Sequence, residues 1–134
     1  MKFFFDANLP GRVAQALATL DPKAHITSPA ERHELRDAED EVLLGLLEEE
    51  GQWVVLTRDR GKKDGDWHMW MASNVTVFFL NRSWSRMKGH EISWRLLKCW
   101  AEVERRAKES PWGSKFRVDK HGRITAIRGK KRKK

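Results

Sequence analysis

The chain has 134 residues, of which 40% are hydrophobic, and it includes seven Trp and six Phe. This length fits one domain, and the apolar content suffices for a packed core, which excludes a wholly disordered chain. The formal net charge is +8, but residues 1–114 carry 17 basic and 18 acidic side chains, whereas residues 115–134 carry ten basic and one acidic. A uniformly basic surface is thereby excluded, and we expect a near-neutral domain over residues 1–114 with a basic C-terminal extension over residues 115–134.

Cysteine content and apolar runs indicate the compartment. Cys99 is the only cysteine, which excludes an intramolecular disulfide framework and a cysteine-based zinc site and fits a reducing cytosol. The apolar run Phe3–Phe5 stops at Asp6, far short of the apolar region of a signal peptide, and no window approaches the roughly 18 apolar residues of a spanning helix. We therefore expect a cytoplasmic protein without a membrane partner.

The first half of the chain alternates between strand and helix patterns. Short or continuous apolar runs predict strands over residues 3–5, 25–27 and 53–57, the last of them buried on both faces. Apolar residues at helical spacing predict a helix that ends near residue 20 and a second helix that ends at Gly51, where a helix C-terminus favours a positive φ.

The second half continues this alternation. Residues 58–74 predict a loop with a short helical turn over 67–71, and residues 75–80 predict a fourth buried strand. A long helix is expected over residues 89–109, followed by a hairpin over residues 116–127 and a disordered basic end. This order predicts an α/β fold, a three-layer α/β/α sandwich with a mainly parallel central sheet and a basic C-terminal hairpin and tail.

Carboxylates follow the predicted strands at the edge where an open parallel sheet places its site. Asp6 follows the first strand, Asp59 follows the third, and the acids Asp37–Glu41 crowd the start of the second helix. Carboxylate oxygens without His or Cys are the ligands of hard cations such as Mg²⁺ or Mn²⁺. The alternative for each acid is local: an Asx turn, a first-turn helix charge, or an ordinary turn.

Three segments carry a resemblance to a known family. They are FFFDANLP at residues 3–10, DAEDEVL at residues 37–43 and GQWVVLTRDR at residues 51–60. In their order and spacing the chain resembles the PIN-like nuclease superfamily, in particular the small branch related to VapC-type toxins, from residue 1 to about residue 110.

The resemblance implies a ribonuclease that depends on Mg²⁺ or Mn²⁺, with Asp6 and Asp59 as metal ligands. Glu39 aligns with the family's middle acid, and Asp40 beside it is the alternative, so the implied catalytic set is Asp6, Glu39, Asp40 and Asp59 and the implied metal set is Asp6, Glu39 and Asp59. The family's further acid falls at Asp64 or Asp66.

Polar and cationic residues around these acids are candidates for RNA contact. Asn8 could bind a phosphate or cap the helix, and the cations beside Asp59 could bind RNA phosphates or simply be solvated: Arg58, Arg60, Lys62 and Lys63. For Trp67, Trp70 and Trp84 we favour core or interface packing over base stacking. The tail adds salt-sensitive RNA affinity, binds an acidic antitoxin, or aids solubility.

We therefore expect a metal-dependent ribonuclease that is the toxin of a toxin-antitoxin pair, with RNA as substrate. A small antitoxin protein and a second copy of the chain are the protein partners left open. One alternative is a PIN-like RNA-binding module without catalysis. The other is a receiver-like phosphoacceptor with Asp59 as the acceptor, which needs a Lys at the end of the last parallel strand, where the sequence has Asn81 and Arg82.

Overall fold

A computed structural model describes residues 1–28, 40–59 and 65–127, except for the side chains of Asp40 and Asp66. One six-stranded sheet runs through the described part, in the order β2-β1-β3-β4-β5-β6. Its strands are β1 (Lys2–Phe5), β2 (His25–Thr27), β3 (Trp53–Arg58), β4 (Thr76–Leu80), β5 (Lys115–Val118) and β6 (Ile124–Ile127). All neighbouring pairs are parallel except β5 and β6, which form an antiparallel hairpin.

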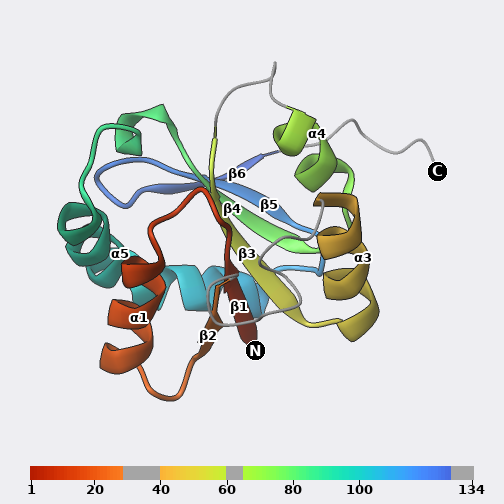
Figure 1. Cartoon of the computed structure of the whole chain (residues 1–134), viewed down its shortest axis with the longest axis horizontal. Helices are drawn as coiled ribbons and strands as arrows, with labels where there is room; N and C mark the ends of the chain where they lie inside the picture. Colours follow the sequence, from red (N-terminus) through yellow and green to blue (C-terminus); the bar gives the residue numbers. More distant parts are fainter. Residues whose placement is uncertain (29–39, 60–64, 128–134) are drawn as a thin grey trace.

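Helices cover both faces of the sheet in the described part of the chain, as Figure 1 shows. The helices α1 (Gly11–Leu20) and α5 (Gly89–Glu109) lie on one face, and α3 (Asp40–Glu50) and α4 (Gly65–Ala72) lie on the other. The predicted three-layer α/β/α sandwich with a mainly parallel sheet is confirmed. No helix among the described residues is long and apolar enough to cross a membrane.

Alternation along the strands supplies the core on both faces of the sheet. In β1, Phe3 and Phe5 pack toward α1 and α5, whereas Phe4 packs toward α3 and α4. In β3, Val54 and Leu56 lie on the first of these faces. Both faces of these strands are therefore apolar, which is why the sequence shows continuous apolar runs instead of alternation.

The C-terminal hairpin belongs to this sheet. β5 pairs with β4 in parallel, with Phe78 opposite Phe116, and these two rings stack with centroids 4.7 Å apart. Lys115, the first residue of the predicted basic extension, is 7% exposed, and its Nζ donates to the carbonyls of Ser73, Val75 and Gly113 at 2.5–2.8 Å. Burial lowers the pKa of Lys115 to about 8. Residues 115–127 thus complete the sheet, and six of the chain's basic residues lie beyond them in the sequence.

One helix is longer than predicted, and a short turn that was not predicted precedes another. The helical turn expected over residues 67–71 is part of the longer helix α4, because Trp70 is buried and Trp67 packs beside it against the sheet. The long helix α5 spans residues 89–109, as predicted, and a short 3₁₀ turn η1 (Arg82–Trp84) precedes it. Burial of Trp70 and Trp84 confirms the core packing favoured for them.

Candidate acidic site at the sheet edge

The strand order places a topological switch point between β1 and β3. The chain leaves β1 to form α1 on one face, and it leaves β3 toward α4 on the opposite face. In open α/β sheets, the crevice between two such diverging connections is the usual ligand site. Asp6 follows β1 and Asp59 follows β3, so both carboxylates lie at this crevice.

Asp6 is held rigidly at the end of β1. Its side chain is buried, with 9% of the residue exposed. Oδ2 accepts a hydrogen bond from Thr57 Oγ1 at 2.8 Å, and Oδ1 accepts one from the backbone N–H of Ala7 at 2.7 Å. The backbone N–H of Asp6 donates to Leu56 at 2.9 Å and so continues the pairing of β1 with β3. These bonds fix the direction of the carboxylate before any ligand arrives.

Asn8 extends the same strand pairing with its side chain. Its Oδ1 accepts from the N–H of Arg58 at 3.2 Å, and its Nδ2 donates to the carbonyl of Arg58 at 3.3 Å and to Thr57 Oγ1 at 3.0 Å. A side-chain amide carries the same donor and acceptor as a peptide group, so Asn8 pairs with β3 as another strand residue would. The structure thus gives Asn8 a positioning contact, and its contact with RNA stays a prediction.

Asp59 lies at the junction of three strands. Its N–H donates to the carbonyl of Leu80 at 2.8 Å, which ties the end of β3 to β4. Its side chain is 11% exposed, and its Oδ2 lies 3.5 Å from Nη2 of Arg117 on β5. Side chains alternate along each strand, and this alternation puts Asp6, Thr57, Asp59 and Arg117 on the α3 and α4 face of the sheet. The two predicted acids therefore face the same layer of the fold.

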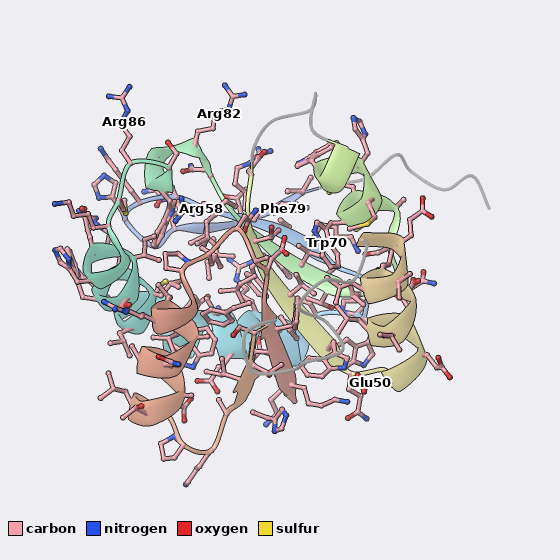
Figure 2. The ribbon with its side chains drawn as sticks, viewed as in Figure 1. Glu50, Arg58, Trp70, Phe79, Arg82 and Arg86 are labelled. Atoms are coloured by element: carbon pink, nitrogen blue, oxygen red, sulfur yellow. The ribbon has the colours of Figure 1, made fainter. Side chains whose placement is uncertain are left out.

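Cations surround the outer side of this edge. A cavity of about 380 Å³ is lined by Arg58, Asp59, Asn81, Arg82 and Ser85. Figure 2 shows Arg82 and Arg86 projecting outward from the segment after β4, while Arg58 lies inward of them at the same edge. A carboxylate can bind a metal ion, and guanidinium groups beside it can bind phosphate oxygens. The arrangement therefore suits a phosphate that is bound together with a metal ion.

The backbone alone places Asp40, and most of the other predicted site residues lie outside the described residues. α3 ends two residues before β3 begins and therefore runs back along the sheet, which places its first residue, Asp40, near the ends of β1 and β3. Glu41, also in this first turn, is exposed. Glu39, Arg60, Lys62, Lys63 and Asp64 lie outside the described residues, as do the side chains of Asp40 and Asp66.

Carboxylates that follow two neighbouring strands are the described acidic donors at this edge. Within the described residues, no group of three or more His, Cys, Asp or Glu side chains comes together to hold a metal. Asp6 and Asp59 nonetheless supply carboxylate oxygens without a nitrogen or sulfur donor, which fits Mg²⁺ or Mn²⁺ and does not favour zinc. Such cations keep several waters, so two protein carboxylates are compatible with binding.

The sequence did not predict the roles of two residues at this edge, Thr57 and Arg117. Thr57 contacts both Asp6 and Asn8, but it reads as the polar end of an apolar strand. Arg117 contacts Asp59, although 58 positions separate the two in the sequence and Arg117 falls in a hairpin pattern. Thr57 and Arg58, directly before Asp59, are the only local signal of these contacts. A polar residue in a strand that is otherwise buried on both faces requires a hydrogen-bond partner.

The fold and this edge define an α/β protein with an acidic site at the switch point of a mainly parallel sheet. The chain belongs to the PIN-like domain family: the sequence model described as "PIN like domain" matches residues 1–82, which span β1 to the start of η1. Domains of this superfamily are generally nucleases and typically use divalent metals. No curated protein and no solved structure gives a match.

Proposed function

We propose that this protein is a Mg²⁺- or Mn²⁺-dependent ribonuclease in which Asp6 and Asp59 are metal ligands, completed by Glu39 or Asp40. The observation that carries this proposal is the Thr57 contact, which fixes the Asp6 carboxylate beside the strand that delivers Asp59. Two acids on adjacent strands, facing one layer of the fold, provide the oxygen donors that the metal requires. The family's general nuclease activity is consistent with this donor set.

In this proposal a bound divalent ion would activate water and stabilise the leaving oxygen of the phosphodiester. The chain's own residues do the positioning. Thr57 donates to Oδ2 of Asp6 and the N–H of Ala7 donates to Oδ1, which together orient the carboxylate, while Asn8 keeps β1 and β3 in register beside it. Arg58 and Arg82 line the adjoining cavity, where guanidinium groups bind phosphate oxygens through paired N–H donors.

The experiment compares wild type with Asp6→Asn and Asp59→Asn by Mn²⁺ thermal shift and by cleavage of a labelled single-stranded RNA. Asp21→Asn is the matched control, because Asp21 lies after α1 and accepts from Trp100 Nε1, a role that an amide oxygen can keep. We expect Mn²⁺ to raise the Tm of wild type and of the control but not of the two site variants. We expect cleavage to follow the same division, and cleavage that persists in EDTA or in both site variants contradicts the proposal.

The toxin role is a further part of this proposal. It predicts that expression of the wild-type chain arrests bacterial growth, that Asp59→Asn relieves the arrest, and that a small antitoxin protein binds the chain. If bacteria grow normally while they express a folded chain that cleaves RNA, the ribonuclease proposal stands and the toxin role is contradicted.

A non-catalytic RNA-binding module is the second candidate, and the Arg117 contact favours it. A guanidinium beside Asp59 supplies positive charge at the place where the nuclease uses a metal. This candidate predicts RNA binding that falls with salt, survives Asp6→Asn and Asp59→Asn, and is accompanied by no Mn²⁺ shift.

The phosphoacceptor alternative rested on β4 as the last parallel strand, but β5 is also parallel to its neighbour. The cation that β5 places at Asp59 is Arg117 and not a lysine. Labelling of wild type, but not of Asp59→Asn, by a small phosphodonor would favour this alternative over the nuclease.

A further inference from the structure

Arg117 reaches the acidic site from a part of the chain that lies outside the matched family segment. The family match ends at residue 82, whereas Arg117 is the third residue of β5. Its neighbours Phe116 and Val118 are buried in the core toward α1 and α5, so alternation turns Arg117 to the opposite face, where Asp59 lies. The position of the guanidinium is thus set by β5 itself and by the core on its other face.

The contact between Arg117 and Asp59 has the properties of an exchangeable pair. The Nη2 to Oδ2 distance is 3.5 Å, which is longer than a well-formed charged hydrogen bond, and the Arg117 side chain is 44% exposed. A pair this open to solvent contributes little to stability, so little is lost when it separates. The guanidinium has five N–H donors in a planar fork, which matches the oxygens of either a carboxylate or a phosphate.

A divalent ion on Asp59 would weaken the attraction between this carboxylate and the Arg117 guanidinium. Two positive groups on one carboxylate repel each other, while the phosphate of a bound nucleic acid brings negative charge to the same edge. Arg82 lines the cavity that Asp59 also lines, and Arg117 contacts Asp59 from β5, so cations from the end of β4 and from β5 both lie near this carboxylate. The side chain of Arg117 is long enough to turn from a carboxylate to a neighbouring phosphate without moving the strand.

We propose that Arg117 is a substrate-positioning residue that pairs with Asp59 in the metal-free protein and moves to a phosphate oxygen of RNA when Asp59 takes up the metal. This inference rests on the proposed function, because it assumes that Asp59 binds metal. It makes Arg117 a competitor of the metal and a partner of the substrate, so its removal has opposite effects on the two ligands.

The experiment uses wild type, Arg117→Ala, Arg117→Lys and the matched control Arg123→Ala, an exposed arginine on the same hairpin. The concentration of Mn²⁺ that gives a half-maximal rise in Tm measures metal binding. Fluorescence anisotropy of a labelled single-stranded RNA in EDTA measures binding without metal. Initial rates of RNA cleavage in Mn²⁺ give KM and kcat separately.

For Arg117→Ala we expect Mn²⁺ to bind about two- to fivefold more tightly and KM for RNA to rise about tenfold, with kcat changed by less than about threefold. RNA affinity in EDTA should change by less than about twofold, because Arg117 is then paired with Asp59. In Arg117→Lys, KM should return part of the way to the wild-type value. Arg123→Ala should leave the Mn²⁺ response at the wild-type value.

Three results overturn the inference. If Arg117→Ala weakens Mn²⁺ binding together with RNA binding, the residue only supports the site structure. If it changes neither ligand, the residue has no part in the site. If wild type shows neither an Mn²⁺ shift nor cleavage, the proposed function fails and this inference fails with it, whereas the first two results leave the nuclease intact.

Discussion

The hydroxyl of Thr57 lies 2.8 Å from Oδ2 of Asp6, and this bond joins the ends of two strands that are 51 positions apart in the sequence. The same hydroxyl accepts from Nδ2 of Asn8 at 3.0 Å. Thr57 is 1% exposed, so both bonds form away from bulk water, where an unsatisfied partner is costly. One buried side chain therefore sets the position of the proposed metal ligand and the register of the two strands.

Thr57→Val keeps the shape of this side chain and removes both hydrogen bonds. Because residues that orient a metal ligand typically contribute 10- to 100-fold to affinity, we expect the Mn²⁺ midpoint of the thermal shift to rise about tenfold. Thr76→Val is the matched control, since Thr76 is equally buried in β4 and its Oγ1 accepts from the N–H of Gly113 at 3.2 Å, far from the acids. Both variants should lose about 1 kcal/mol of unfolding free energy. An equal loss of Mn²⁺ affinity in both would contradict a special role for Thr57.

Arg82 contributes to the electrostatic attraction of RNA if the cavity beside Asp59 receives phosphate. Arg82→Ala should lower RNA affinity and reduce the slope of log affinity against log salt by about 0.7, the value for one phosphate contact with a single strand. Arg105→Ala is the control, because Arg105 on α5 is paired with Glu102 and Glu109. Anisotropy titrations at several salt concentrations measure both slopes, and equal slopes for wild type and Arg82→Ala would place the RNA elsewhere.

Gly122 allows the hairpin that carries Arg117 to pack against α5. It adopts φ of +81°, and a Cβ built on it would lie 2.9 Å from Cβ of Cys99. Gly122→Ala should therefore lower the unfolding free energy by about 2–3 kcal/mol through backbone strain and overpacking. Gly45→Ala in α3, where the added Cβ meets open space, should instead stabilise the chain by about 0.5–1 kcal/mol. Chemical denaturation of both variants checks these opposite signs, and a neutral Gly122→Ala would show that the hairpin packs more loosely.

Lys115 makes stability depend on pH in the alkaline range. Burial lowers its pKa from 10.5 to about 8 in the folded state, whereas the unfolded chain retains the ordinary value. Between these two values the unfolded state binds more protons, so the unfolding free energy rises with pH over this window. Wild type should gain on the order of 2–3 kcal/mol relative to Lys115→Met between about pH 7.5 and pH 10.

Denaturation of the two proteins across this pH range isolates the Lys115 contribution, because all other groups are shared. A constant difference between them would mean that the three carbonyls that Lys115 contacts hold its proton despite burial. Below pH 8, Lys115→Met should be the less stable protein, because it leaves those carbonyls without their donor.

The sequence by itself determined the layers of this fold and the location of its acids. Phe3–Phe5 and Trp53–Leu56 are continuous apolar runs, and a strand covered on both faces buries such runs in few residues. Asp6 and Asp59 follow these runs, so parallel strands necessarily bring them to one edge. Local pattern was sufficient here because both the strand and the acid after it are encoded within a few consecutive residues.

The tertiary structure alone decided which residues complete that edge. The hairpin pattern at residues 116–127 gave no sign that β5 would join β4 in parallel, because strand pairing depends on the buried face of Phe116 and not on any local turn signal. That pairing buries Lys115 and brings Arg117 to Asp59, although both lysine and arginine read as tail charge in the sequence. A net charge calculated from the sequence does not say where each side chain points. Only the packing of β5 determines which cation faces the core, which faces Asp59 and which faces the solvent.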